Sequence, residues 1–205
     1  MKEYPSIDRT IQYGAQAYVF NKIDGSNIRI EWSLKAGIYK FGSRHQLLGE
    51  DNPFLGEAIE LVKNNFKDDF NRIFRKQRYD RAMAFFEFHG DSSFAGYHQP
   101  DESHKVTLID VKPYKSGILN PDEYLDLFGH LDHAELLYRG KISKEFVEQV
   151  RNSGLPGMSE EGVVCKVKEA KKTKHPKMFK IKTLRWLHKL KELCKDDEKL
   201  YNRLL

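Results

Sequence analysis

The segment Lys22-Ile23-Asp24-Gly25-Ser26-Asn27 contains the side chain with the clearest chemical potential, the amine of Lys22. It follows an apolar run at residues 18–20 and meets a glycine turn, which places the lysine at the end of a predicted strand. A neutral lysine amine is a nucleophile, but an ordinary pKa of about 10.4 leaves it protonated at neutral pH. Taken alone, a lysine in a surface hairpin is the simpler interpretation.

Later segments place further charged side chains where they can serve such a lysine. Glu87 lies within an aromatic strand pattern, and Glu161 precedes Gly-Val-Val at a strand entrance. Lys180 and Lys182 are two residues apart, so in a strand their side chains point to one face. Acids on an exposed strand and charges that protect an edge strand are the ordinary alternatives.

The elements that must hold these residues are mostly strands. Ile28, Ile30 and Trp32 alternate with polar residues, which is the period of a half-buried strand. Similar patterns predict strands at 18–22, 37–44, 82–89, 105–111, 134–139, 162–167 and 178–181. Residues 154–159 and 169–177 are predicted to be a loop and a lysine-rich connector.

Apolar residues at three- and four-residue steps predict helices among these strands. One or two helices are expected from Asn52-Pro53, where proline suits the first turn, to about residue 74. A capping box begins at Asn120, another helix is expected at 143–152, and a terminal helix is expected from Leu184 onward. These elements predict an α+β fold, mainly antiparallel sheets with packed helices.

The charge of the chain is compatible with a polyanionic partner. The formal net charge is +5, and the stretch 166–199 holds twelve Lys and one Arg against five acids. Such a stretch attracts phosphates, although a solvated lysine-rich surface explains it equally well. The candidates for phosphate contacts in the connector are Lys171, Lys172 and Lys174.

The remaining composition suits a cytoplasmic protein without a membrane association. No apolar run approaches the roughly 18 residues of a membrane span, and the N-terminus lacks the apolar stretch of a secretory signal. Two cysteines do not make a disulfide framework. We expect a reducing environment and a monomer.

Taken in order, these segments resemble the motifs of the covalent nucleotidyltransferase superfamily, which contains polynucleotide ligases and mRNA capping enzymes. The forms K-I-D-G-S-N and F-E-F-H-G look most like ATP-dependent RNA ligases, particularly the phage nick-sealing class and its relatives. The matching elements span positions 22 to 182: K-x-D-G at Lys22, Ser43-Arg44, E-x-x-G at Glu87, a strand ending in Asp110, E-G-V-V at Glu161, and K-x-K at Lys180 and Lys182.

The resemblance implies an ATP-grasp-like nucleotidyltransferase domain and a three-step reaction. Lys22 would attack the α-phosphate of ATP and release pyrophosphate, which leaves a lysine–AMP adduct. AMP would then pass to the 5′-phosphate of an RNA end, and a 3′-hydroxyl would displace it to seal the ends. Dividing one difficult step into easier ones is the usual advantage of covalent catalysis.

The resemblance also implies a role for each matched residue. Lys180 and Lys182 would neutralise phosphate charge and favour a neutral Lys22. Glu161 would organise Mg²⁺ or Mn²⁺, which prefer oxygen ligands. The remaining nucleotide contacts would be Glu87 to the ribose, Arg44 and Asn27 to phosphate, Asn21 to the adenine edge, and Val163 and Ile109 on the two faces of the base.

The chain departs from the pattern in two places. Many ligases have a glutamate two positions before the nucleophile, where this chain has Phe20. Many also have an aromatic residue for adenine stacking where this chain has Ile109, so one face of the base would be covered by an aliphatic side chain.

The resemblance also implies a domain organisation and leaves rival functions. Residues 1–183 are expected to form the nucleotidyltransferase domain, and residues 184–205 a short helical extension without an OB-fold, since about 23 residues are too few for that barrel.

The rivals are a DNA ligase, a GTP-dependent capping-type enzyme, and an RNA-binding relative without catalysis. The last should lack Lys22, Glu161 or the lysine pair, all of which are present.

Overall fold

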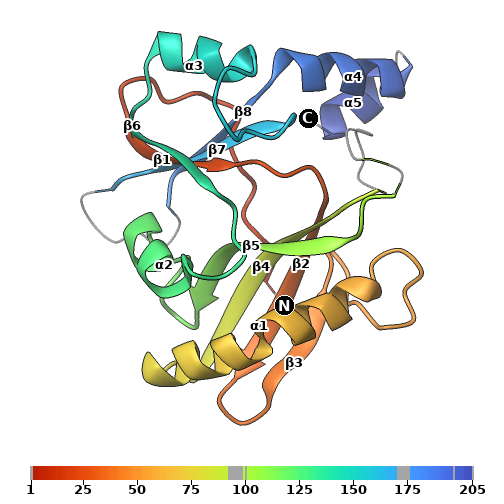
Figure 1. Cartoon of the computed structure of the whole chain (residues 1–205), viewed down its shortest axis with the longest axis vertical. Coiled ribbons are helices and arrows are strands. Elements are labelled where there is room, and N and C mark those ends of the chain that lie inside the picture. Colours follow the sequence, from red (N-terminus) through yellow and green to blue (C-terminus); the bar gives the residue numbers. More distant parts are fainter. Residues whose placement is uncertain (1, 92–98, 100, 170–175, 196, 205) are drawn as a thin grey trace.

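The structure, a computed structural model, describes residues 2–91, 99, 101–169, 176–195 and 197–204. Its strands form two antiparallel sheets of four strands each, which lie one above the other in Figure 1. The upper sheet consists, in spatial order, of β6 (Leu136–Lys141), β1 (Gln16–Asn21), β7 (Gly162–Val167) and β8 (Met178–Lys182). The lower sheet consists of β3 (Gly37–Gly42), β2 (Ser26–Ser33), β4 (Arg81–His89) and β5 (Lys105–Pro113). The expected α+β fold with antiparallel sheets is confirmed.

The chain passes from the upper to the lower sheet between β1 and β2. These strands are consecutive in sequence but do not pair with each other: β1 pairs with β6 and β7, and β2 pairs with β3 and β4. The segment 22–25 is therefore a connection between sheets and not the hairpin that was the simpler interpretation of the sequence.

The long helix α1 (Glu57–Lys76) covers the lower sheet and builds the larger core (Figure 1). Phe70 and Phe74 are fully buried, and their rings stack with centroids 4.9 Å apart. Phe70 also lies 6.0 Å from Phe86 of β4. The apolar period of the sequence thus identified the face of α1 that packs on the sheet.

The predicted start of this helix at Asn52-Pro53 is wrong. The carboxamide oxygen of Asn52 accepts hydrogen bonds from the backbone N–H groups of Phe54 and Leu55, at 3.1 and 2.9 Å, and so closes a turn that precedes the helix. Phe54, which fits the helical period in sequence, is 81% exposed. The helix begins at Glu57, four residues after Pro53.

Helix α2 (Pro121–Phe128) begins where the capping box predicts. The side chain of Asn120 accepts a hydrogen bond from the backbone N–H of Glu123 at 3.0 Å. The same helix adds Tyr124 to the larger core, where its hydroxyl donates to the backbone carbonyl of Leu108 at 2.9 Å.

The upper sheet has its own core on the face covered by α3 (Lys144–Arg151). Ser143 caps this helix, as its predicted position suggests, by accepting from the backbone N–H of Phe146 at 3.1 Å. Val147 and Val150 pack there with Val163. The neighbouring strand β6 is shifted two residues from the predicted 134–139, and β3 ends two residues before the predicted 44.

The expected C-terminal helix consists of two helices, α4 (Leu184–Cys194) and α5 (Glu198–Leu204). Lys195 adopts a left-handed conformation with φ of 44°, which ends α4. Cys165 and Cys194 are both buried and not disulfide-bonded. Within the part of the chain that the structure describes, none of the helices is of a length and apolarity that would let it cross a membrane.

We predict that Phe70→Ala lowers the free energy of unfolding by about 3–5 kcal/mol, because it leaves a cavity among aromatic rings that are fully buried. Phe54→Ala is the matched control and should change stability by less than about 0.5 kcal/mol, since Phe54 is 81% exposed. Urea denaturation followed by circular dichroism measures both. Equal losses for the two variants would contradict the position given to Phe54.

Candidate active site

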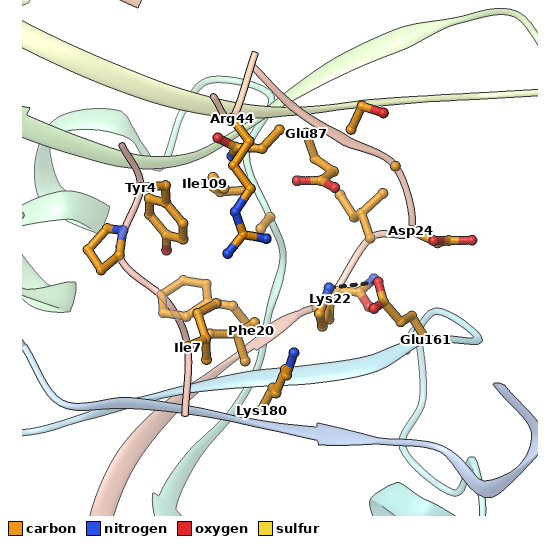
Figure 2. Close-up of a pocket in the computed structure, with 18 of the residues that line it drawn as sticks. Tyr4, Ile7, Phe20, Lys22, Asp24, Arg44, Glu87, Ile109, Glu161 and Lys180 are labelled. Atoms are coloured by element: carbon orange, nitrogen blue, oxygen red, sulfur yellow. Dashed lines mark ion pairs between the residues drawn. The ribbon is translucent and has the colours of Figure 1, made fainter. Parts of the chain in front are cut away.

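A cavity of about 570 Å³ lies between the facing surfaces of the two sheets. Figure 2 shows Lys22, Glu161 and Lys180 reaching the cavity from the upper sheet and the segments next to its strands. Glu87 and Arg44 enter it from the opposite side. Its size is that of ordinary small-ligand sites. The structure thus brings together residues such as Lys22 and Lys180, which are 158 positions apart in the sequence.

The cavity wall on the upper sheet is built by strand alternation. Phe20 of β1 is paired with Val164 of β7, and both line the cavity together with Lys166, two residues further along. Lys180 and Lys182 of β8 also face it, as their spacing predicts. The residues between them point to the opposite face, into the core covered by α3.

Lys22 is held at the crossing between the sheets by backbone contacts. Its N–H donates to the carbonyl of Gly162 at 2.9 Å, and the hydroxyl of Ser159 donates to its carbonyl. Three residues later the chain passes so close to β4 that a Cβ on Gly25 would lie 2.3 Å from the carbonyl oxygen of Phe88. Only glycine allows this approach, which fixes where the lysine leaves the sheet.

The ammonium of Lys22 forms an ion pair with Glu161, which also binds Lys182. The distances are 2.7 Å from Lys22 Nζ to one carboxylate oxygen and 3.0 Å from Lys182 Nζ to the other. The side chains of Glu161 and Lys182 are 5% and 8% exposed, and that of Lys22 is 19% exposed. One carboxylate therefore holds two lysines in a largely dehydrated site.

The expectation that neighbouring cations favour a neutral Lys22 is wrong for the ligand-free protein. Burial acts to lower the pKa of Lys22, but the carboxylates of Glu161 and Glu87 act in the other direction and leave this pKa above its ordinary value. Lys22 is thus protonated at neutral pH, and a change in its surroundings must precede any nucleophilic attack.

In the cavity, the lysine pair on β8 has lowered pKa values. Burial, reinforced by the Lys182 cation, lowers the pKa of Lys180 to about 8. Burial also lowers the pKa of Lys182 to about 8, against the attraction of Glu161. Both remain mainly protonated at neutral pH and can attract an anion into the cavity.

Glu87 faces the cavity from β4, directly across from Asn27 of β2. Burial raises the pKa of Glu87 to about 8, although Lys22 acts to lower it. In the ligand-free protein its carboxyl group is mostly protonated near neutral pH, so it can donate as well as accept a hydrogen bond. Asn27 donates to the carbonyl of Phe86 at 3.3 Å, and its own buried Oδ1 has no hydrogen-bond partner among the described residues.

Two other predicted residues line the cavity in different ways. Arg44 follows β3 in a turn closed by Ser43 and Gln46, and Figure 2 shows its guanidinium pointing toward the centre of the cavity. Asn21 uses its side chain to hold the loop 157–159: it donates to the carbonyl of Gly157 at 3.1 Å and accepts from the N–H of Ser159 at 2.8 Å.

The structure corrects the prediction for Val163. Its side chain is fully buried in the core beneath α3, and Val164 lines the cavity instead. The sequence Gly-Val-Val does not tell which valine faces which side, because both faces of β7 accept an apolar residue. Ile109 does line the cavity, at a register shift of β5 opposite Phe85 and Phe86.

Several cavity residues were not identified from the sequence. The ammonium of Lys166 lies 2.6 Å from Asp110, and that of Lys182 lies 3.4 Å from the ring centroid of Trp186. Strand alternation leads to Lys166 only once Val164 is known to face the cavity, and nothing in the spacing indicated Tyr4 or Trp186. The proposed phosphate contacts Lys171, Lys172 and Lys174 lie outside the described residues.

Most of the cavity residues lie within a region that matches a known family. The sequence model of the RNA ligase family matches residues 15–182. A search of curated proteins finds no match.

Solved structures of the Naegleria gruberi RNA ligase are similar in fold. A mutant with ATP and Mn gives a TM-score of 0.63 at 17% identity, covering 86% of this chain and 52% of that one. The structure with PPi gives 0.65 at 18% identity, with 93% and 60% covered. A mutant with AMP and Mn gives 0.64 at 16% identity, with 91% and 59% covered. The chain therefore spans between 52% and 60% of the length of these structures.

The family match runs from the start of β1 to the end of β8 and includes the connection that carries Lys22, the Glu161 carboxylate and both lysines of β8. The chain belongs to the RNA ligase family.

Proposed function

We propose that this protein is an ATP-dependent RNA ligase that works through a covalent Lys22–AMP intermediate. The Nζ atom of Lys22 forms a bond to the α-phosphorus of ATP as the bond to pyrophosphate breaks. A 5′-phosphate oxygen of an RNA end then takes the AMP from the lysine. A 3′-hydroxyl attacks that activated phosphate, which seals the ends and releases AMP.

The observation that carries the proposal is the placement of Lys22 in the charge cluster of the cavity. Its ammonium lies 2.7 Å from Glu161, and Lys180 and Lys182 face the same space from β8. Cations fixed beside a phosphate stabilise the charge that develops during its transfer. Structures of the Naegleria gruberi RNA ligase with ATP, AMP or PPi share the fold, which supports a nucleotide as the ligand.

Deprotonation of Lys22 is the step that the ligand-free site opposes, since Glu161 and Glu87 raise its pKa. A ligand that takes over Glu161 would remove the strongest attraction for the lysine proton. Glu87 supplies the next attraction for this proton. Because the pKa of Glu87 is about 8, it is mostly protonated at neutral pH, and part of that attraction is already absent. We propose that binding of the substrates thereby prepares the nucleophile.

Glu161 is the residue we propose to hold a divalent cation, Mg²⁺ or Mn²⁺. The described residues contain no cluster of three or more His, Cys, Asp or Glu that could hold a metal ion, so phosphate oxygens and water would complete the coordination. This ligand set suits Mg²⁺, which often retains waters and binds through one or two carboxylates and substrate phosphates. When bound, such an ion would supply positive charge that stabilises the phosphates during transfer.

For the rest of the nucleotide, we propose that Arg44 and Asn27 contact phosphate, that Glu87 contacts the ribose, and that Ile109 and Val164 lie against the base. Residues 1–183 would act as the nucleotidyltransferase domain. The helical extension would complete its wall, because Trp186 of α4 lines the cavity beside Lys182.

We predict that the protein incubated with ATP and Mg²⁺ gains the mass of one AMP, and that Lys22→Ala and Lys22→Arg do not. Arginine keeps the positive charge but is not a nucleophile, so it separates charge from covalent chemistry. Intact mass spectrometry makes the measurement. Lys35→Ala, at an exposed turn, is the control and should be labelled normally.

The rival functions give different outcomes in the same assay. Labelling by GTP alone would indicate a capping-type enzyme, and labelling by ATP followed by sealing of DNA ends alone would indicate a DNA ligase. If neither nucleotide labels Lys22 with Mg²⁺ or Mn²⁺ present, the ligase proposal is wrong.

We predict that AMP binds less tightly as the pH rises through about 8. The pKa of Lys180 and that of Lys182 are lowered to about 8, so above this pH their protons are lost in the unliganded protein and must be regained on binding an anion. The phosphate of AMP is already fully charged there, since its second pKa is about 6. Calorimetry should show affinity falling about tenfold or more between about pH 7.5 and about pH 9.5.

The double substitution Lys180→Arg with Lys182→Arg is the matched variant for this pH dependence. Arginine stays charged throughout the range, so the slope of affinity against pH should be much reduced. If the affinity of the unaltered protein for AMP stays constant across this pH range, the lysine pair does not bind the phosphate as assigned.

A further inference from the structure

The segment 3–8 runs along the cavity from one sheet to the other, and Tyr4, Pro5 and Ile7 line it. At one end the carboxylate of Glu3 lies 3.1 Å from Nδ1 of His45, next to Arg44 in the turn that follows β3. At the other end the backbone of Asp8 pairs with β8: its N–H donates to Met178 at 3.2 Å, and its carbonyl accepts from Lys180 at 2.9 Å. The segment precedes the residues matched by the family.

Within this segment, Tyr4 is anchored at both its hydroxyl and its ring. The hydroxyl donates to Asp110 Oδ2 at 2.5 Å, and the other oxygen of Asp110 accepts from Lys166 at 2.6 Å. The ring centroid lies 5.0 Å from that of Phe85. Burial and the Asp110 carboxylate hold the pKa of Tyr4 well above its usual range, so the hydroxyl remains a donor. The ring is therefore fixed in one position at the cavity wall.

One end of the cavity is formed by the Lys22–Glu161 charge cluster, and the other end offers aromatic and apolar surface beside the Lys166–Asp110 ion pair. In the view of Figure 2, Lys22 and Glu161 lie to the right and Tyr4 and Ile7 to the left, with Ile109 beside the Tyr4 ring, while Lys180 and the Arg44 guanidinium lie between the two groups. A nucleotide has the same division, because its phosphates are anionic and its base has two flat faces suited to apolar or aromatic contacts. With the phosphates at the lysines, the base extends toward Tyr4.

Tyr4 has the aromatic surface available for such a base. Phe20 also lines the apolar end, but it is 2% exposed, and the Lys166 ammonium lies 4.6 Å from its ring centroid. Ile109 offers no π-face. Tyr4 is only partly buried and faces the cavity, so its ring can lie against a ligand.

We propose that Tyr4 is a nucleotide-binding residue that stacks on the adenine base of the bound nucleotide, so that the segment 3–8 supplies a wall of the nucleotide site. This inference rests on the proposed function in that the ligand is ATP or AMP. It assigns to the N-terminal segment the aromatic contact that Ile109 cannot make. The Tyr4–Asp110–Lys166 contacts position the ring.

Binding of AMP and of pyrophosphate, each measured by calorimetry without metal, tests the proposal. AMP reaches both ends of the cavity, whereas pyrophosphate needs only the lysines. Tyr4→Leu should weaken AMP by about 5- to 100-fold, the range for loss of one stacked base, and leave pyrophosphate within about twofold. Tyr4→Phe keeps the ring and should bind AMP more tightly than Tyr4→Leu. The control Tyr13→Leu, at a side chain 54% exposed and outside the cavity lining, should change neither.

A Tyr4→Trp variant gives a second measurement that does not depend on Tyr4→Leu being folded. Stacking by AMP should quench the fluorescence added by this indole, and pyrophosphate should not. Equal weakening of both ligands in Tyr4→Leu, or unchanged AMP binding, would overturn the proposal, as would the absence of quenching. Failure of the ligase proposal is separate: AMP binding that depends on Tyr4, in a protein that never forms the Lys22 adduct, would refute the ligase mechanism alone.

Discussion

The ion pair between Lys22 and Glu161 is the interaction on which the arrangement of the site depends. Taking two charges out of water is costly unless they are paired with good geometry, and here one carboxylate at 2.7 and 3.0 Å compensates two lysines. The fold secures this geometry at two glycines. Gly25 lets the crossing chain pass β4, and Gly162, with φ of 125°, lets β7 start where a Cβ would lie 2.2 Å from the carbonyl oxygen of Ile181.

This charge cluster makes the ligand-free site a resting state. The carboxylate of Glu161 holds the proton of Lys22, while the buried lysines of β8 have pKa values of about 8. In the proposed mechanism, the cavity would attract phosphate while Lys22 is still protonated. In that mechanism, the same Glu161 that keeps Lys22 protonated would hold the divalent cation, so activation of Lys22 would be coupled to the presence of substrate.

The sequence predicted much of this site because its residues lie on regular strands. The two-residue spacing of Lys180 and Lys182 placed them on one face, and the order of the motifs grouped them with Lys22 and Glu161. Positions that depend on packing were less predictable. Val163 and Val164 are equally apolar, and the hydrogen bonds that make Asn52 close a turn, and so leave Phe54 exposed, have no signature in the helical period.

The sequence by itself determined the chemical groups, the alternation of the strands and the family, because these depend on residue types and short spacings. Only the tertiary structure decided which segments meet across the cavity. Tyr4 and Asp110 are far apart in the chain but share a hydrogen bond, and the pKa of Lys22 is raised by carboxylates from other elements. Contacts and pKa values of this kind depend on distances between elements. Local patterns fix the face of a strand, whereas the packing of two sheets fixes what that face meets.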